Sequence, residues 1–234
     1  MRQNMEEQKK DKKPFSNSCL NGAADMENPW KEIGLETYEK HMRLDSVRQL
    51  QALNSLMKDQ LSAYPAESVM IFGAAGGNGF EHISTEQYRT VYAVDINSEY
   101  LRTVSERYAE LLPILRCLHL DLVHEAEKLP QAELVIANLL IEYIGYAAFQ
   151  KAVQQASPRY VSAVIQINRD AAEWVSDSPY LHEFDRLNAV HHQMDEQALT
   201  AAMQEIGYTA VFHAEKALPN GKALLRTDYL RSNG

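Results

Sequence analysis

Apolar side chains recur at helical spacing in the part of the chain that precedes residue 65. One stripe covers residues 35–42, and a second covers residues 47–61. Ser46, followed three residues later by a glutamine, fits a capping box at the start of the second helix, and Pro65 is expected to end it. Residues 29–65 are therefore expected to form a helical pair, in a natural position for an N-terminal lid.

From residue 68 onward, short continuous apolar runs alternate with helical patterns, and such runs are typical of strands buried on both faces of a sheet. Five strands are predicted at residues 69–72, 91–94, 114–120, 134–137 and 160–167, with helices at 98–108 and 142–156. After an irregular stretch, a helix is expected from Asp195 to Gly207, followed by two strands around the hairpin signal Asn220-Gly221. The chain thus predicts an α/β fold, with a doubly wound, mostly parallel seven-stranded sheet and a C-terminal antiparallel hairpin in residues 66–234.

Composition and charge are those of a soluble globular protein with one α/β domain. Of the 234 residues, 45% are hydrophobic and 24% are charged, and the formal net charge is -9. An acidic chain is repelled by nucleic-acid phosphates and anionic membranes, so neither is the expected partner. Residues 1–28 interleave lysines with acids without hydrophobic periodicity, which predicts a mobile polar tail. The chain shows no membrane span and no signal peptide, so we expect a cytoplasmic protein, while its oligomeric state cannot be read from the sequence.

No metal site is expected. The two cysteines lie far apart, and His119, Asp121 and His124 only superficially resemble a metal cluster. Alternation along a strand places only the first two on one face, while His124 lies beyond the strand's end. His191 and His192 would point apart in extended chain, and we interpret them as loop residues.

A glycine-rich segment follows the first predicted strand, and residues 73–79 read GAAGGNG. Small residues allow the backbone to turn sharply and its amides to approach a ligand closely, here ahead of an expected short helix. Asp95 ends the second predicted strand, 22 residues beyond Gly73. This is close to the spacing at which a carboxylate accepts both hydroxyls of a ribose. The combination predicts a site for a nucleoside-containing cofactor.

The register of Gly73, Ala75, Gly77 and Gly79 resembles the G-x-G-x-G motif of class I S-adenosylmethionine-dependent methyltransferases. The resemblance extends from about Trp30 to the C-terminus, including the terminal hairpin. It implies that an acid after the second strand holds the ribose, an Asp-Leu pair after the third contacts the adenine, and an Asn-Leu pair after the fourth lines the methionine end. The residues expected to bind S-adenosyl-L-methionine are Gly73, Ala74, Ala75, Gly77, Gly79, Asp95, Ile96, Asp121, Leu122, Asn138 and Leu139.

Two positions depart from that family's pattern. Ile71 stands where many members have an acid, and Ala75 replaces the middle glycine. A non-catalytic S-adenosylmethionine-binding regulatory protein is therefore one alternative. A nicotinamide-dependent oxidoreductase is another, since Gly73, Gly76 and Gly79 also fit G-x-x-G-x-x-G, but the Tyr-x-x-x-Lys pair of that class is missing.

The resemblance implies methyl transfer, in which the protein aligns the acceptor and, where necessary, removes its proton. No Pro-Pro-Tyr or Pro-Pro-Phe run follows Asn138, and with the acidic charge this favours a small-molecule acceptor over a nucleic acid. The candidate catalytic residues are Glu142 and Tyr143, which follow the fourth strand, and Tyr38 and His41, which share one face of the first helix.

Overall fold

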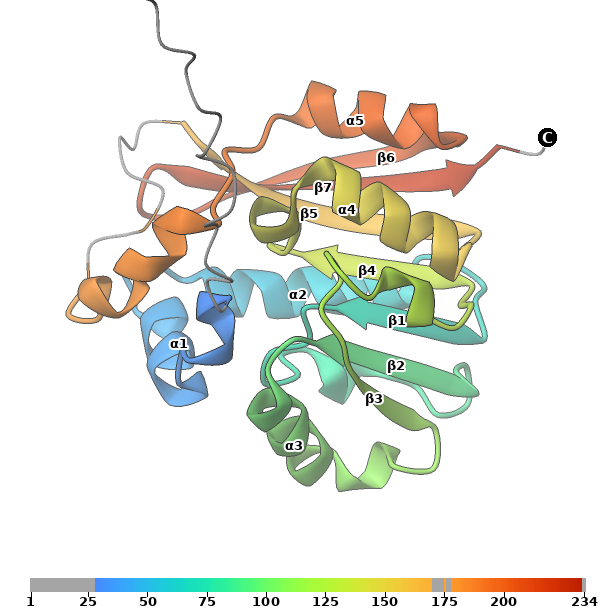
Figure 1. The fold of residues 1–234 in the computed structure, drawn as a ribbon, viewed down its shortest axis with the longest axis horizontal. Helices are drawn as coiled ribbons and strands as arrows, with labels where there is room; N and C mark the ends of the chain where they lie inside the picture. The colour runs from blue at the N-terminus through green and yellow to red at the C-terminus, as the bar shows by residue number, and fades with distance from the viewer. Residues whose placement is uncertain (1–27, 170–174, 176–177, 233–234) are drawn as a thin grey trace, which may run out of the picture.

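The structure is a computed structural model that describes residues 28–169, 175 and 178–232. Within these residues a seven-stranded sheet has the order β3-β2-β1-β4-β5-β7-β6 (Figure 1). The strands are β1 (Ser68–Phe72), β2 (Thr90–Asp95), β3 (Leu115–His119), β4 (Leu134–Asn138), β5 (Tyr160–Asn168), β6 (Tyr208–Ala217) and β7 (Lys222–Arg231). β1 to β5 pair in parallel, and β7 is antiparallel to both β5 and β6. The predicted sheet and its C-terminal hairpin are confirmed.

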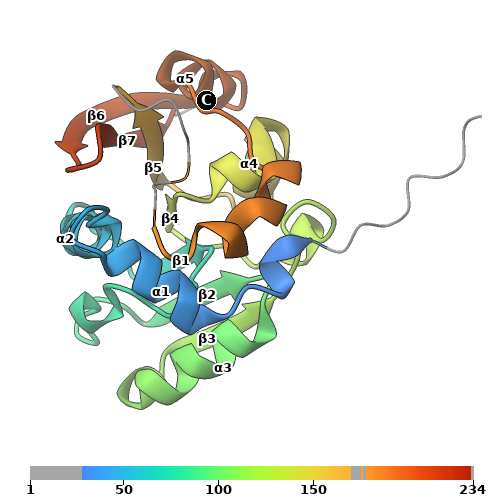
Figure 2. The ribbon, with the colours of Figure 1, turned by 90° about the vertical axis from the view of Figure 1, so that its left-hand side faces the viewer.

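Helices cover both faces of the sheet. The α-helices are α1 (Leu35–Arg43), α2 (Gln49–Ser62), α3 (Ser98–Arg107), α4 (Ile141–Ala156) and α5 (Glu196–Glu205). Short 3-10 segments are η1 (Pro29–Lys31), η2 (Phe80–His82), η3 (Ala109–Leu111), η4 (Ala126–Lys128) and η5 (Leu181–Ala189). Figure 2 looks onto one end of the sheet, where α1 and η5 lie across the strands. None of the described helices is long and apolar enough to cross a membrane.

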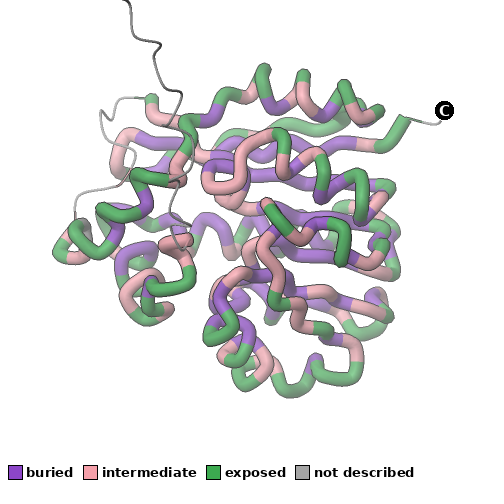
Figure 3. The backbone as a smooth tube through the Cα atoms, viewed as in Figure 1, coloured by how far each residue is buried: buried purple, intermediate pink, exposed green. Residues whose placement is uncertain are grey.

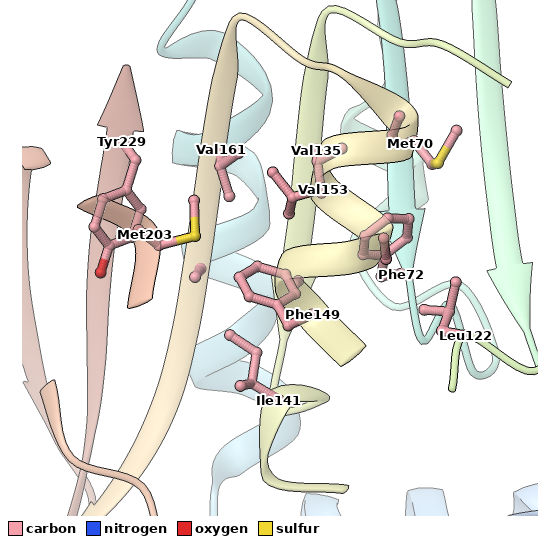
Figure 4. Packing of buried hydrophobic residues seen from close by; sticks show 14 of the residues in the cluster. Met70, Phe72, Leu122, Val135, Ile141, Phe149, Val153, Val161, Met203 and Tyr229 are labelled. Carbon is pink, nitrogen blue, oxygen red and sulfur yellow. The ribbon is translucent and has the colours of Figure 1, made fainter. Parts of the chain in front are cut away.

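Buried residues are concentrated along the strands and on the inner sides of the helices (Figure 3). On one face, Phe149 and Val153 of α4 pack against Phe72 and Val135 (Figure 4). On the other face, α2 and α3 pack against β1 and β2. α2 is thus a layer of the core, because its apolar stripe meets the sheet, whereas α1 crosses the strand ends. The predicted lid over residues 29–65 stays a prediction, and of the predicted tail only Asn28 lies within the described residues.

One local prediction was wrong. α2 begins at Gln49, and its N-cap is Arg48 with φ +52° and no side-chain cap, so Ser46 forms no capping box. Val47 is fully buried, and its N–H and that of Arg48 both donate to the carbonyl of Leu44. The resulting turn occupies residues 44–48, so the helix begins only after it. The short helix expected after the glycine segment is the 3-10 helix η2, which follows its N-cap Gly79, a residue with φ +91°.

Candidate functional site

The site lies where the strand order reverses, between the neighbouring strands β1 and β4. In open α/β sheets, ligands bind outside the carboxyl ends of the strands at such a point. Two adjoining cavities lie here: the glycine-loop cavity, of about 660 Å³, and the Glu142 cavity, of about 580 Å³. Both volumes include the open mouths. The two cavities share a wall made by Trp30, Tyr38, Leu139 and Tyr143.

The glycine-loop cavity brings together seven of the residues expected at the cofactor. They are Gly73, Ala75, Asp95, Ile96, Asp121, Leu122 and Leu139. Ala74 and Asn138 line a recess next to it, under α1. Gly77 and Gly79 instead permit close packing, since a Cβ at either would lie 2.7 Å from a side chain, that of Tyr108 or Met57. Their role in the structure is to let α2 and α3 approach the loop.

Asp95 is buried at the end of β2 and organises the glycine loop. Its carboxylate accepts the backbone N–H of Ala75 and that of Asn97, each at 2.9 Å. Burial raises the pKa of Asp95, while these hydrogen bonds act in the opposite direction. Ala75, the residue in place of the middle glycine, has φ +45° in the left-handed region. The bond from its amide to Asp95 therefore holds the loop in a conformation that glycine would adopt more easily.

Asp121 and Leu122 follow β3 on the other side of the cavity. One carboxylate oxygen of Asp121 accepts the backbone N–H of Val123 at 2.9 Å, which fixes the turn after the strand. Leu122 is buried against the core.

Asn138, at the end of β4, has a partner that the sequence did not indicate. Its side-chain amide and that of Gln60 on α2 exchange two hydrogen bonds of 2.9 Å. Gln60 is fully buried and also donates to Ser162 Oγ at 2.9 Å, and Ser162 in turn donates to Asp228. Both polar ends of the Asn138 side chain are thus engaged by the core. Periodicity shows only that position 60 faces inward, so no local signal could have identified this pair.

The Glu142 cavity collects all four candidate catalytic residues: Tyr38, His41, Glu142 and Tyr143. Glu142 lies in the first turn of α4 and is 3% exposed. Its Oε1 accepts the backbone N–H of Gln166 at 2.8 Å. Its Oε2 is buried and has no hydrogen-bond partner among the described residues. Burial raises the pKa of Glu142 to about 7.

Aromatic rings form most of the boundary between the two cavities. The Trp30 ring meets the Tyr143 ring edge-on, with centroids 4.8 Å apart, and the Tyr38 ring at 5.7 Å. Burial raises the pKa of both tyrosines, so their hydroxyls are protonated at neutral pH. The rings offer an apolar surface, and a ring face stabilises a nearby cation.

Two histidines complete the Glu142 cavity, and the sequence indicated one of them. His41 Nδ1 lies 2.8 Å from Ser178 Oγ, and the ring packs on Phe184 of η5. His191, interpreted as a loop residue, lines the same cavity. Burial, with the charge of Lys222 as a further cause, lowers the pKa of each histidine to about 4. Both imidazoles are therefore neutral at pH 7. The segment that contains η5 supplies Phe184, Leu187 and His191 to the lining of this cavity. The sequence predicts only an irregular stretch here, so this contribution could not be predicted from it.

Hydrogen bonds join η1 and α1 to α3 and its N-cap, which follow the strand that ends at Asp95. Asn97 Nδ2 donates to the carbonyl of Trp30 at 2.9 Å, and the Tyr100 hydroxyl donates to that of Ile33 at 2.8 Å. Arg107 of α3 pairs with Glu39 of α1 through both carboxylate oxygens and donates to the carbonyl of Gly76 at 3.2 Å. These bonds fix η1 and α1 over the glycine loop. Across the described residues, His, Cys, Asp and Glu side chains form no group of three suited to a metal ion.

Comparisons with known proteins give structural matches only. No protein-family model and no curated protein sequence matches the chain. Magnesium protoporphyrin IX methyltransferase from Synechocystis, with S-adenosylmethionine bound, matches with a TM-score of 0.60 at 9% identity, over 90% of this chain and 100% of that one. N-methyltransferase NodS from Bradyrhizobium japonicum, bound to S-adenosylhomocysteine, matches with a TM-score of 0.58 at 12% identity. The match covers 88% of this chain and 100% of that one. The cyclase SpnF matches with a TM-score of 0.60 at 9% identity, over 82% of this chain and 85% of that one.

These likenesses establish the fold. The chain has the Rossmann-like fold of class I S-adenosylmethionine-dependent methyltransferases. The cyclase among the matches shows that the same fold carries other chemistry, so the function has to be argued from the site.

Proposed function

We propose that the chain is an S-adenosylmethionine-dependent methyltransferase acting on a small-molecule acceptor. The observation that carries the proposal is the pair of cavities with a common aromatic wall. A methyl donor in one cavity and an acceptor in the other would meet at that wall, which is the alignment that an in-line transfer requires. Structural neighbours bound to S-adenosylmethionine or S-adenosylhomocysteine support the choice of cofactor.

The residues around the glycine-loop cavity fit this cofactor. Asp95 would accept the ribose hydroxyls, Asp121 and Leu122 would contact the adenine, and the loop from Gly73 would surround the methionine end. When bound, the cofactor supplies an electrophilic methyl group on a positively charged sulfur. Glu39 of α1 lines the same recess as Ile71 and would supply the acid that is missing at that position.

The other cavity would hold the acceptor. Glu142 has a pKa of about 7, and its Oε2 has no hydrogen-bond partner among the described residues. It is therefore suited to take a proton from the nucleophile. Tyr38 and Tyr143 would position the reacting groups at the common wall. His41, neutral at pH 7, would hold the acceptor by a hydrogen bond and would not carry charge.

Titration calorimetry with S-adenosylmethionine, S-adenosylhomocysteine and oxidised nicotinamide dinucleotide tests the cofactor assignment. We expect both sulfur nucleosides to bind and the dinucleotide not to bind. Asp95→Ala should weaken binding by about 1.5–3 kcal/mol, or about 10- to 150-fold, because a charged acceptor of two hydroxyls is lost. The exposed Asp59→Ala is the matched control. Binding of the dinucleotide alone, or unchanged affinity in Asp95→Ala, would contradict the assignment.

The non-catalytic alternative makes a different prediction. It requires the cofactor to bind without any methylated product forming from a panel of small acceptors. Product formation, detected by mass spectrometry, separates it from the proposed enzyme.

A further inference from the structure

The strongest unexplained feature of the site is the free oxygen of Glu142. This side chain is 3% exposed, and its Oε2 has no hydrogen-bond partner among the described residues. A buried carboxylate oxygen without a partner is energetically unfavourable, so such groups commonly mark a ligand site. Glu142 lines the cavity, and its other oxygen is held by the backbone N–H of Gln166 at 2.8 Å. The carboxylate is therefore fixed in position.

Glu142 is the one acidic side chain among the described residues that line its cavity. Among the described residues that line the Glu142 cavity, none is a lysine or an arginine. Lys222 lowers the pKa of His41 and His191 and is not among the causes that move the pKa of Glu142. Both histidines stay neutral, so neither supplies a positive charge. The cavity accordingly favours a cationic ligand and disfavours an anionic one.

The remaining lining favours an apolar body. Trp30, Tyr38, Tyr143 and Phe184 contribute rings, and Met42 and Leu187 add aliphatic surface. Trp30 lies nearly perpendicular to Tyr38 and to Tyr143, at 83° and 82°, so both edges and faces of rings are presented. Ring faces stabilise a nearby cation, and the ring surface buries apolar area of the ligand.

We propose that the Glu142 cavity binds an amine acceptor, with a protonated amino group against Oε2 of Glu142 and an apolar body against the aromatic lining. The inference rests on the proposed function, because it names the acceptor of the same transfer. Glu142 takes a proton from the ammonium group and becomes a carboxylic acid, which frees the nitrogen lone pair. That pair forms the new nitrogen–carbon bond to the methyl group. The carbon–sulfur bond breaks with its electrons left on sulfur, which ends as a neutral thioether, and the product nitrogen carries the positive charge.

Three probes with the same ring and different head groups test the inference. They are 2-phenylethylamine, 2-phenylethanol and 3-phenylpropanoate, titrated by calorimetry at pH 8 into the full chain saturated with S-adenosylhomocysteine. We expect the amine to bind about tenfold more tightly than the alcohol, since a hydrogen bond to a charged group is worth about that factor, and the carboxylate to bind most weakly. Glu142→Gln keeps the shape and removes the charge, so it should abolish the preference for the amine over the alcohol.

The control is Glu110→Gln, which changes the net charge equally at an exposed position, and it should behave as the wild type. The inference is overturned if the amine does not bind or binds no more tightly than the alcohol. It is also overturned if Glu142→Gln still binds the amine more tightly than the alcohol. Absence of S-adenosylhomocysteine binding to the wild type contradicts the proposed function instead, so the two failures are distinguishable.

Discussion

Replacing Glu142 with glutamine isolates the energetic effect of one buried carboxylate on the fold. In the unfolded chain this carboxyl group has a pKa of 4.5, and burial raises the value in the folded chain to about 7. Between these two values the folded state binds more protons than the unfolded state, so the free energy of unfolding falls as the pH rises. Above pH 7 the loss is complete.

The magnitude follows from the two pKa values. Each pH unit between them corresponds to about 1.4 kcal/mol, so the carboxylate destabilises the fold by about 3 kcal/mol at pH 8 and by about 1 kcal/mol at pH 5. Glutamine fills the same space and its oxygen can still accept the Gln166 N–H, but it cannot ionise. Glu142→Gln should therefore be more stable than the wild type, with an advantage that grows over this pH range. In a domain of this size, 3 kcal/mol corresponds to about 6–12 °C in Tm.

Urea unfolding followed by circular dichroism at pH 5, 6, 7 and 8 measures the difference directly. The control is again Glu110→Gln, whose difference from the wild type should not change with pH. A constant difference for Glu142→Gln, or a variant less stable than the wild type at pH 8, would refute the reasoning. Either result would mean that a partner compensates the buried charge.

Two further predictions concern the loop and the core beneath it. Ala75→Gly should raise the free energy of unfolding by about 0.5–1 kcal/mol, because relief of the left-handed strain at φ +45° exceeds the added backbone entropy; a lower Tm in thermal unfolding would contradict this. Gln60→Ala should lower the free energy of unfolding by about 2–4 kcal/mol, because it removes three hydrogen bonds and leaves the amide of Asn138 and the hydroxyl of Ser162 without this partner. Urea unfolding measures the second effect, and the exposed Gln51→Ala should change the stability by much less.

Much of the fold could be predicted from local pattern. The apolar runs marked the first five strands within a few residues, because a buried parallel strand needs uninterrupted apolar side chains, and the Asn-Gly hairpin signal marked the last two. The cap of α3 is equally local, since the Asn97 side chain accepts the N–H groups of Glu99 and Tyr100. Both signals lie within a few neighbouring residues. Arg48 shows the limit, since its left-handed conformation at the start of α2 depends on how Val47 packs.

The sequence by itself determined the order of strands and helices, the glycine loop and the acid at the end of β2, because each depends on short-range spacing. Only the tertiary structure decided that Glu142 faces a cavity with one oxygen unpartnered, and that His191 lies in the same cavity as His41. It also decided the pairing of Gln60 with Asn138. These arrangements join elements far apart in the chain, and burial, which sets the pKa values, exists only once those elements have packed together.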